Sequence, residues 1–102
     1  MNSPKVYLYR GITYLKVATE YPELAAKNPT ALDIAYESFN KCIEMDSKKA
    51  KYSGQAKEHM LNVAIAYYND GYSQYEAQTF DGAITAFNRT KELLAYDVNG
   101  DL

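Results

Sequence analysis

Residues 54–78 read GQAKEHMLNVAIAYYNDGYSQYEAQ, and this stretch decides the fold. Its apolar and aromatic residues recur at alternating intervals of four and three, at Leu61, Ile65, Tyr68, Tyr72 and Tyr75. This spacing places all of them on one face of an α-helix. The stretch therefore predicts a long helix from Gly54 to Gln78 that carries a stripe of tyrosines.

Three other segments have the same helical periodicity. Residues 5–19 repeat apolar side chains, and the Ser3–Pro4 pair before them is typical of a helix start. Residues 30–45 follow with a second apolar ladder that Asp46–Ser47 ends, and residues 82–95 form the last helix. We expect Asp81 to cap that helix, and its inward residues to be Ala83, Ile84, Phe87 and Leu94. No segment alternates with a period of two, so the prediction is an all-α fold with four main antiparallel helices.

The connections between these helices contain proline or are polar. Pro22 and the Asn28–Pro29 pair leave room for one short helical turn at most between the first two helices. Residues 48–53 are rich in lysine and are expected to form a polar connection before the long helix.

Length and charge limit the function. The 102 residues make one small domain, 1–102, and 11 basic against 13 acidic residues leave a net charge of −2. Without a basic excess, we expect no nucleic-acid binding. No apolar run is long enough to insert into a membrane, and residues 1–5 lack the features of a signal peptide. We expect a soluble chain, although it begins abruptly and could lack a native leader; the compartment stays open.

Candidate chemical sites are few. His59 is the only histidine and has no further ligand spaced to join it around a metal. Cys42, the only cysteine, is expected to pack as a small apolar residue. Asp97, Asn99 and Asp101 open like a calcium loop, but Leu102 stands where that loop needs glycine. No nucleotide-binding or nucleophile motif is present, so we expect no enzyme, cofactor or metal.

The first and second halves of the chain share a pattern of small and aromatic residues. Ala35-x3-Phe39 and Ala83-x3-Phe87 lie 48 residues apart, and Gly11 and Gly71 lie 60 apart. Each glycine is expected where its helix approaches the facing helix closely, and each alanine serves the same purpose on that facing helix.

These residues resemble the tetratricopeptide repeat, a pair of helices with a W-x2-L-G-x2-Y pattern followed by A-x3-F. The resemblance covers nearly the whole chain and implies that packing within the repeats involves Tyr7, Gly11, Tyr14, Ala35, Phe39, Cys42, Tyr67, Gly71, Ala83 and Phe87. Arg10 and Asp70 replace the leucine, Gln74 replaces the second tyrosine, and no proline closes either unit. The separations exceed the usual period of about 34 residues. We therefore expect a first repeat at 5–46 with an insertion near 21–28, and a second at 54–96 with a lengthened first helix.

The resemblance also implies a function. Such repeats stack into a solenoid whose first helices line a groove for segments of other proteins. The groove residues carried over by position are Leu8, Ile12, Leu15, Ile65, Tyr68, Asn69, Tyr72 and Tyr75. The family's clamp for a carboxylate terminus needs lysine and asparagine, where this chain has Leu8, Ile12, Tyr68 and Tyr72, so we expect no such clamp. The alternative for the tyrosine stripe is that it packs against a neighbouring helix.

The number of repeats leaves a second function open. Solenoids generally need about three repeats to be stable, and the insertions leave only two in this chain. We therefore expect either a segment of a longer repeat protein, acting as a scaffold covered by flanking repeats, or self-association through an exposed end.

Overall fold

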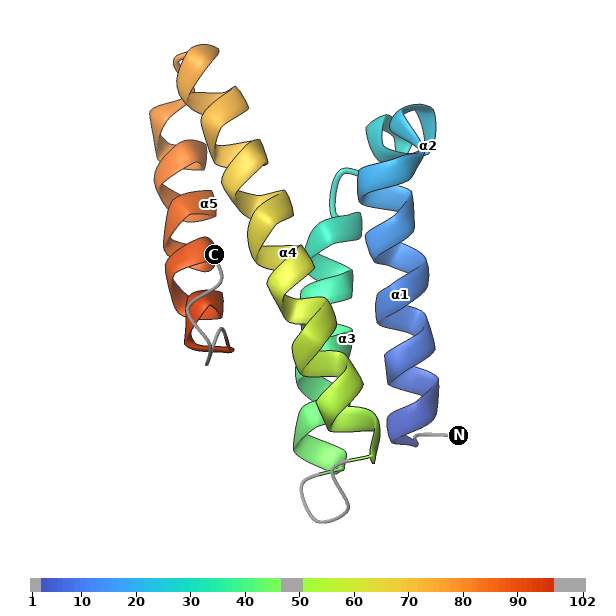
Figure 1. Ribbon diagram of the computed structural model, residues 1–102. Helices are drawn as coiled ribbons and strands as arrows, with labels where there is room; N and C mark the ends of the chain where they lie inside the picture. The colour runs from blue at the N-terminus through green and yellow to red at the C-terminus, as the bar shows by residue number, and fades with distance from the viewer. Residues whose placement is uncertain (1–2, 47–50, 97–102) are drawn as a thin grey trace. The chain divides into compact units, whose positions relative to one another are not determined.

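The computed structural model describes residues 3–46 and 51–96, and helices dominate this part of the chain (Figure 1). In chain order they are α1 (Pro4–Glu20), α2 (Pro22–Lys27), α3 (Ala31–Met45), α4 (Lys51–Glu76), α5 (Phe80–Leu93) and the 3-10 turn η1 (Leu94–Tyr96). The described residues contain no β-strand, which confirms the all-α prediction. None of their helices is long and apolar enough to span a membrane.

The start of α1 follows the predicted chemistry. The Ser3 hydroxyl accepts a hydrogen bond from the Val6 N–H at 3.3 Å, and Pro4 occupies the first helical position. Proline is tolerated there because its missing N–H would have no partner within the helix. The segment predicted to hold one turn at most forms the six-residue helix α2, which begins at Pro22 and has no fully buried residue.

Contacts divide the chain into two compact units, residues 1–60 and 61–102, and the division falls within α4. The first unit contains α1, α2, α3 and the first turns of α4, and the second contains the rest of α4, α5 and η1. These bounds differ from the predicted repeats at 5–46 and 54–96. The difference arises because residues 51–60 extend α4 and pack with the first unit.

Phe39 lies at the centre of the first unit and is fully buried. A Cβ built on Gly11 of α1 would come within 2.6 Å of the Phe39 ring, so only glycine fits here without displacing the ring. The His59 ring of α4 stacks on Phe39, with 5.4 Å between the ring centroids and 9° between the planes. Residues from three helices therefore meet at this phenyl ring.

Asp46 connects the end of α3 to the start of α4. It is buried, and its Oδ2 accepts hydrogen bonds from the backbone N–H groups of Tyr52 and, at 2.9 Å, of Ser53. These donors belong to the first turn of α4, where N–H groups have no partner within the helix. With them satisfied, α4 begins at Lys51, three residues earlier than predicted.

The second unit has its own glycine contact. A Cβ on Gly71 of α4 would lie 2.8 Å from the Phe87 ring of α5 and 3.2 Å from the Ala86 Cβ. The buried residues of α5 are Ala83, Ala86 and Leu93. The prediction that Ile84 and Leu94 point inward is wrong, because they are 58% and 42% exposed. Each follows a buried residue directly, and one residue turns a helix by about 100°.

The turn between α4 and α5 explains where α5 begins. Gln78 has a positive φ of 65°, and the Gln78 and Thr79 N–H groups donate to the carbonyls of Tyr75 and Gln74. This is the Schellman pattern that ends a helix. The Thr79 hydroxyl also donates to the Gln74 carbonyl. The predicted cap at Asp81 is wrong: α5 begins at Phe80 after Thr79, and Asp81 lies in its first turn.

Candidate interaction surface

The second unit exposes a group of large apolar side chains on its two helices, which we call the aromatic face. Each is between 44% and 58% exposed. The α4 members lie at helical spacing on one side of the helix, and the α5 members are one turn apart. The aromatic face consists of Ile65, Tyr68, Tyr72 and Tyr75 from α4 and of Phe80 and Ile84 from α5.

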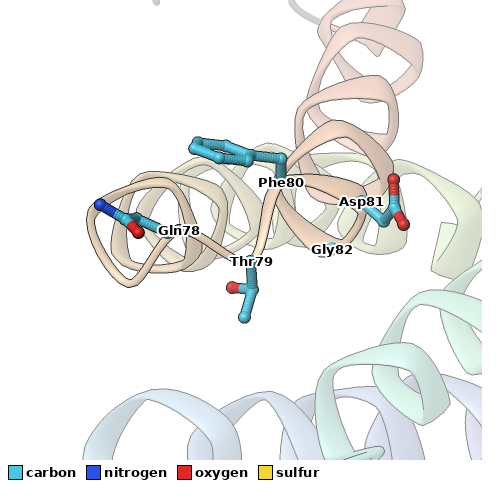
Figure 2. A pocket seen from close by; sticks show the side chains of 5 residues that line it. All are labelled: Gln78, Thr79, Phe80, Asp81 and Gly82. Carbon is cyan, nitrogen blue, oxygen red and sulfur yellow. The ribbon is translucent and has the colours of Figure 1, made fainter.

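Ring contacts join the two helices across this face. Tyr75 meets Phe80 edge to face, with 5.7 Å between centroids, close to the turn. Figure 2 shows Phe80 and Thr79 pointing to different sides of that turn. Both residues line a surface depression together with Gln78, Asp81 and Gly82. Further along, Tyr68 meets Phe87 at 5.8 Å and a tilt of 51°. Two ring pairs therefore connect α4 with α5 beside the aromatic face.

Exposed charged residues lie close in sequence to both ends of the aromatic face. Glu76 follows Tyr75 in the chain, Asp81 follows Phe80, and both are exposed beside the turn. Lys91 is exposed in the last turn of α5, at the opposite end. Asn69, the predicted contact for a ligand backbone, is exposed on α4 directly after Tyr68. Carboxylates are thus exposed beside the turn, whereas the last turn of α5 carries both signs of charge, because the exposed Glu92 follows Lys91.

The predicted groove residues of the first unit lie elsewhere. Leu8 and Leu15 are only 1% and 8% exposed, and Ile12 is half-buried. We expected these side chains to line an open groove, but they belong to the interior of the first unit. A ligand could not reach Leu8 or Leu15 without opening that core.

The residues expected to pack within the repeats are at least half-buried. Tyr7, Tyr14 and Phe87 are half-buried, and the fully buried members are Gly11, Ala35, Phe39, Cys42, Tyr67, Gly71 and Ala83. Phe80 and Ile84 were not among the predicted surface residues. Phe80 directly follows the Gln78–Thr79 turn, and Ile84 lies four residues later. This spacing of four is the sequence signal that places both residues on one side of α5.

The pKa shifts of Cys42 and His59 in the first unit are those of packed side chains and not of reactive groups. Burial, and secondarily the charge of Asp46, raises the pKa of the Cys42 thiol, so the thiol stays protonated. Burial lowers the pKa of His59, and nearby Glu58 opposes this shift. In the described part of the chain, no three His, Cys, Asp or Glu side chains are grouped to hold a metal ion. The calcium-like residues 97–101 lie outside the described residues.

Comparisons with protein-family models, with curated proteins and with solved structures give no match to this chain.

Proposed function

We propose that this chain is a non-catalytic protein interaction module, and that the aromatic face binds a peptide or protein segment. The observation that carries the proposal is the joint exposure of tyrosines, Phe80 and isoleucines on two adjacent helices, linked by ring contacts. Contiguous apolar surface of this kind marks interaction sites in soluble proteins. Tyrosine suits such a site because its ring offers apolar area and its hydroxyl can bond a backbone amide.

We further propose that the two units are divergent tetratricopeptide-like hairpins. Support comes from Gly11 against Phe39 and Gly71 against Phe87, which repeat one glycine–phenyl contact at the positions that the sequence pattern aligns. In this reading the binding surface differs from the groove first expected. It includes α5 residues, and it excludes the buried leucines of α1.

A display experiment tests the binding proposal. Random peptides of about 16 residues are selected on the full chain, and the enriched peptides are measured against a double variant, Tyr72→Ser with Ile84→Ser. We expect at least a tenfold loss of affinity, since truncation of a central aromatic contact costs about 2 kcal/mol. The matched control is Tyr9→Ser, which removes a tyrosine of similar exposure from α1. If no enriched peptide distinguishes the double variant from Tyr9→Ser, the aromatic face is not the binding surface.

The alternative function is a structural segment whose apolar face is covered by flanking repeats or by a second copy. The observation in its favour is the same aromatic face, because exposed apolar surface also drives self-association. Sedimentation over a range of concentrations separates the two. Association that Tyr72→Ser with Ile84→Ser abolishes favours the structural segment, and a monomer at all concentrations favours binding to a different protein.

A further inference from the structure

The two units bury equivalent positions very differently. Aligning Gly71 with Gly11 and Phe87 with Phe39 pairs Tyr68, Tyr72 and Tyr75 with Leu8, Ile12 and Leu15. The same alignment pairs Phe80 and Ile84 with Leu32 and Tyr36. Every first-unit member of these pairs is buried or half-buried, and every second-unit member is exposed. At these five positions one helical hairpin is covered where the other is open, whereas Ile65 aligns with Lys5, which is also exposed.

The first unit contains helical segments that the second lacks in its described part. One is α2, and the other is residues 51–60 of α4, which lie against α3 in Figure 1. The second segment is amphipathic: Ala56 and Met60 are fully buried and His59 stacks on Phe39, whereas Lys57 and Glu58 are exposed. This segment thus shows how a helix packs on such a hairpin: it turns residues at i, i+3 and i+4 inward, and the i+3 residue, His59, stacks on Phe39.

We propose that the aromatic face receives an amphipathic α-helix from a partner protein, in the role that residues 51–60 have in the first unit. The inference rests on the proposed binding function and names the class of ligand. Phe87, the counterpart of Phe39, is only half-buried and is contacted by the Tyr68 ring, so a further side chain can still pack beside it. The face from Ile65 to Tyr75 is about 15 Å long, which a helix of about 10 to 12 residues would cover.

Backbone hydrogen bonding favours a helix over an extended peptide. The surface is formed by two helices, whose backbone N–H and C=O groups are largely paired within each helix, and it offers no strand edge for an extended ligand. An extended peptide on apolar rings would bury backbone groups without partners. A helix satisfies its own backbone and can lie on the face through side chains alone.

Charge and direction define the ligand further. Residues 51–60 follow α3 across a short connection and run antiparallel to it (Figure 1). The same direction in the second unit puts the C-terminal end of the partner helix beside the turn, near Glu76 and Asp81. Lysine or arginine in that last helical turn would suit both these carboxylates and the helix dipole. The expected ligand is an amphipathic helix with a basic C-terminal turn.

The display selection on the full chain also tests this inference, with a proline substitution added. We expect enriched peptides to carry apolar residues at i, i+3, i+4 and i+7 and a basic C-terminal turn. A proline at their centre should weaken binding roughly 100-fold, because it breaks a helix. A proline before the first apolar residue is the matched control, and it should change affinity less than threefold.

Other outcomes overturn the inference in distinguishable ways. Peptides that lose affinity on Tyr72→Ser with Ile84→Ser but tolerate the central proline bind in an extended form, so the helix inference fails and the binding function stands. If no peptide depends on the face, both proposals fail. If the chain associates through the face without peptide, a second copy is the occupant, and the partner helix is rejected.

Discussion

Gly11 lies directly against the ring of Phe39, and a Cβ at position 11 would approach Cε1 to 2.6 Å. Phe39 is completely buried and also stacked by His59, so its ring has little room to move. The glycine is therefore required by packing and not by backbone conformation. This contact sets how closely α1 approaches α3.

Alanine substitutions at three glycines should separate packing from helix propensity. Gly11→Ala should lower the free energy of unfolding by about 1 to 2 kcal/mol, because overpacking exceeds the propensity gain of about 1 kcal/mol. Gly71→Ala should cost less, since Phe87 is half-buried and can shift. Gly54 has no atom within 4 Å of its Cβ position, so Gly54→Ala should stabilise by about 1 kcal/mol. Urea unfolding followed by circular dichroism measures all three.

The three variants have a clear order of stability, which makes the packing argument testable. Gly54→Ala should be the most stable, and Gly11→Ala the least. Stabilisation by Gly11→Ala equal to that by Gly54→Ala would show that the Phe39 ring yields without cost, contrary to the close contact described above.

The sequence predicts which residues share a helix face but not which faces are covered. Periodicity placed Tyr68, Tyr72 and Tyr75 together because a helix has a fixed 3.6-residue turn. The same periodicity gave Leu8 and Leu15 an equivalent place, yet they are buried. Coverage depends on long-range packing of segments outside the repeated pattern, and a local pattern carries no information about that.

The ends of helices show the same limit. Ser3 and Pro4 were predictable because a cap acts on the residues that follow it directly. The start of α4 at Lys51 was not, since its first N–H groups bind Asp46, which lies before the connection. A polar stretch with several lysines is typical of a loop. The local pattern does not indicate that the Asp46 carboxylate accepts hydrogen bonds from the backbone N–H groups of Tyr52 and Ser53.

Asp46 should therefore stabilise the first unit as a cap for α4. Asp46→Ala should lower the free energy of unfolding by about 1 to 2 kcal/mol, because two backbone donors of the helix start lose their acceptor. Asp46→Asn keeps an oxygen acceptor and should cost about half as much. Amide hydrogen exchange at Tyr52 and Ser53 should accelerate in both variants.

Asp81→Ala is the control for Asp46→Ala. Asp81 is exposed in the first turn of α5 and provides no side-chain cap, so its loss should cost a few tenths of a kcal/mol through the helix dipole. Equal effects of Asp81→Ala and Asp46→Ala would contradict the capping role of Asp46.

His59 should make the first unit less stable in mild acid. Burial lowers the pKa of His59 below the usual 6.5, so the unfolded chain binds a proton at a pH where the folded chain does not. By linkage, the stability from neutral His59 is fully present above about pH 6.5 and is lost as the pH falls from there toward the folded pKa.

His59→Gln has no such titration but retains a polar side chain. The stability difference between wild type and His59→Gln, measured by urea unfolding at several values between about pH 7.5 and 5.5, should shrink as the pH falls. A difference that grows in acid would mean that the imidazolium is favoured in the folded unit, against the stacking of a neutral ring on Phe39.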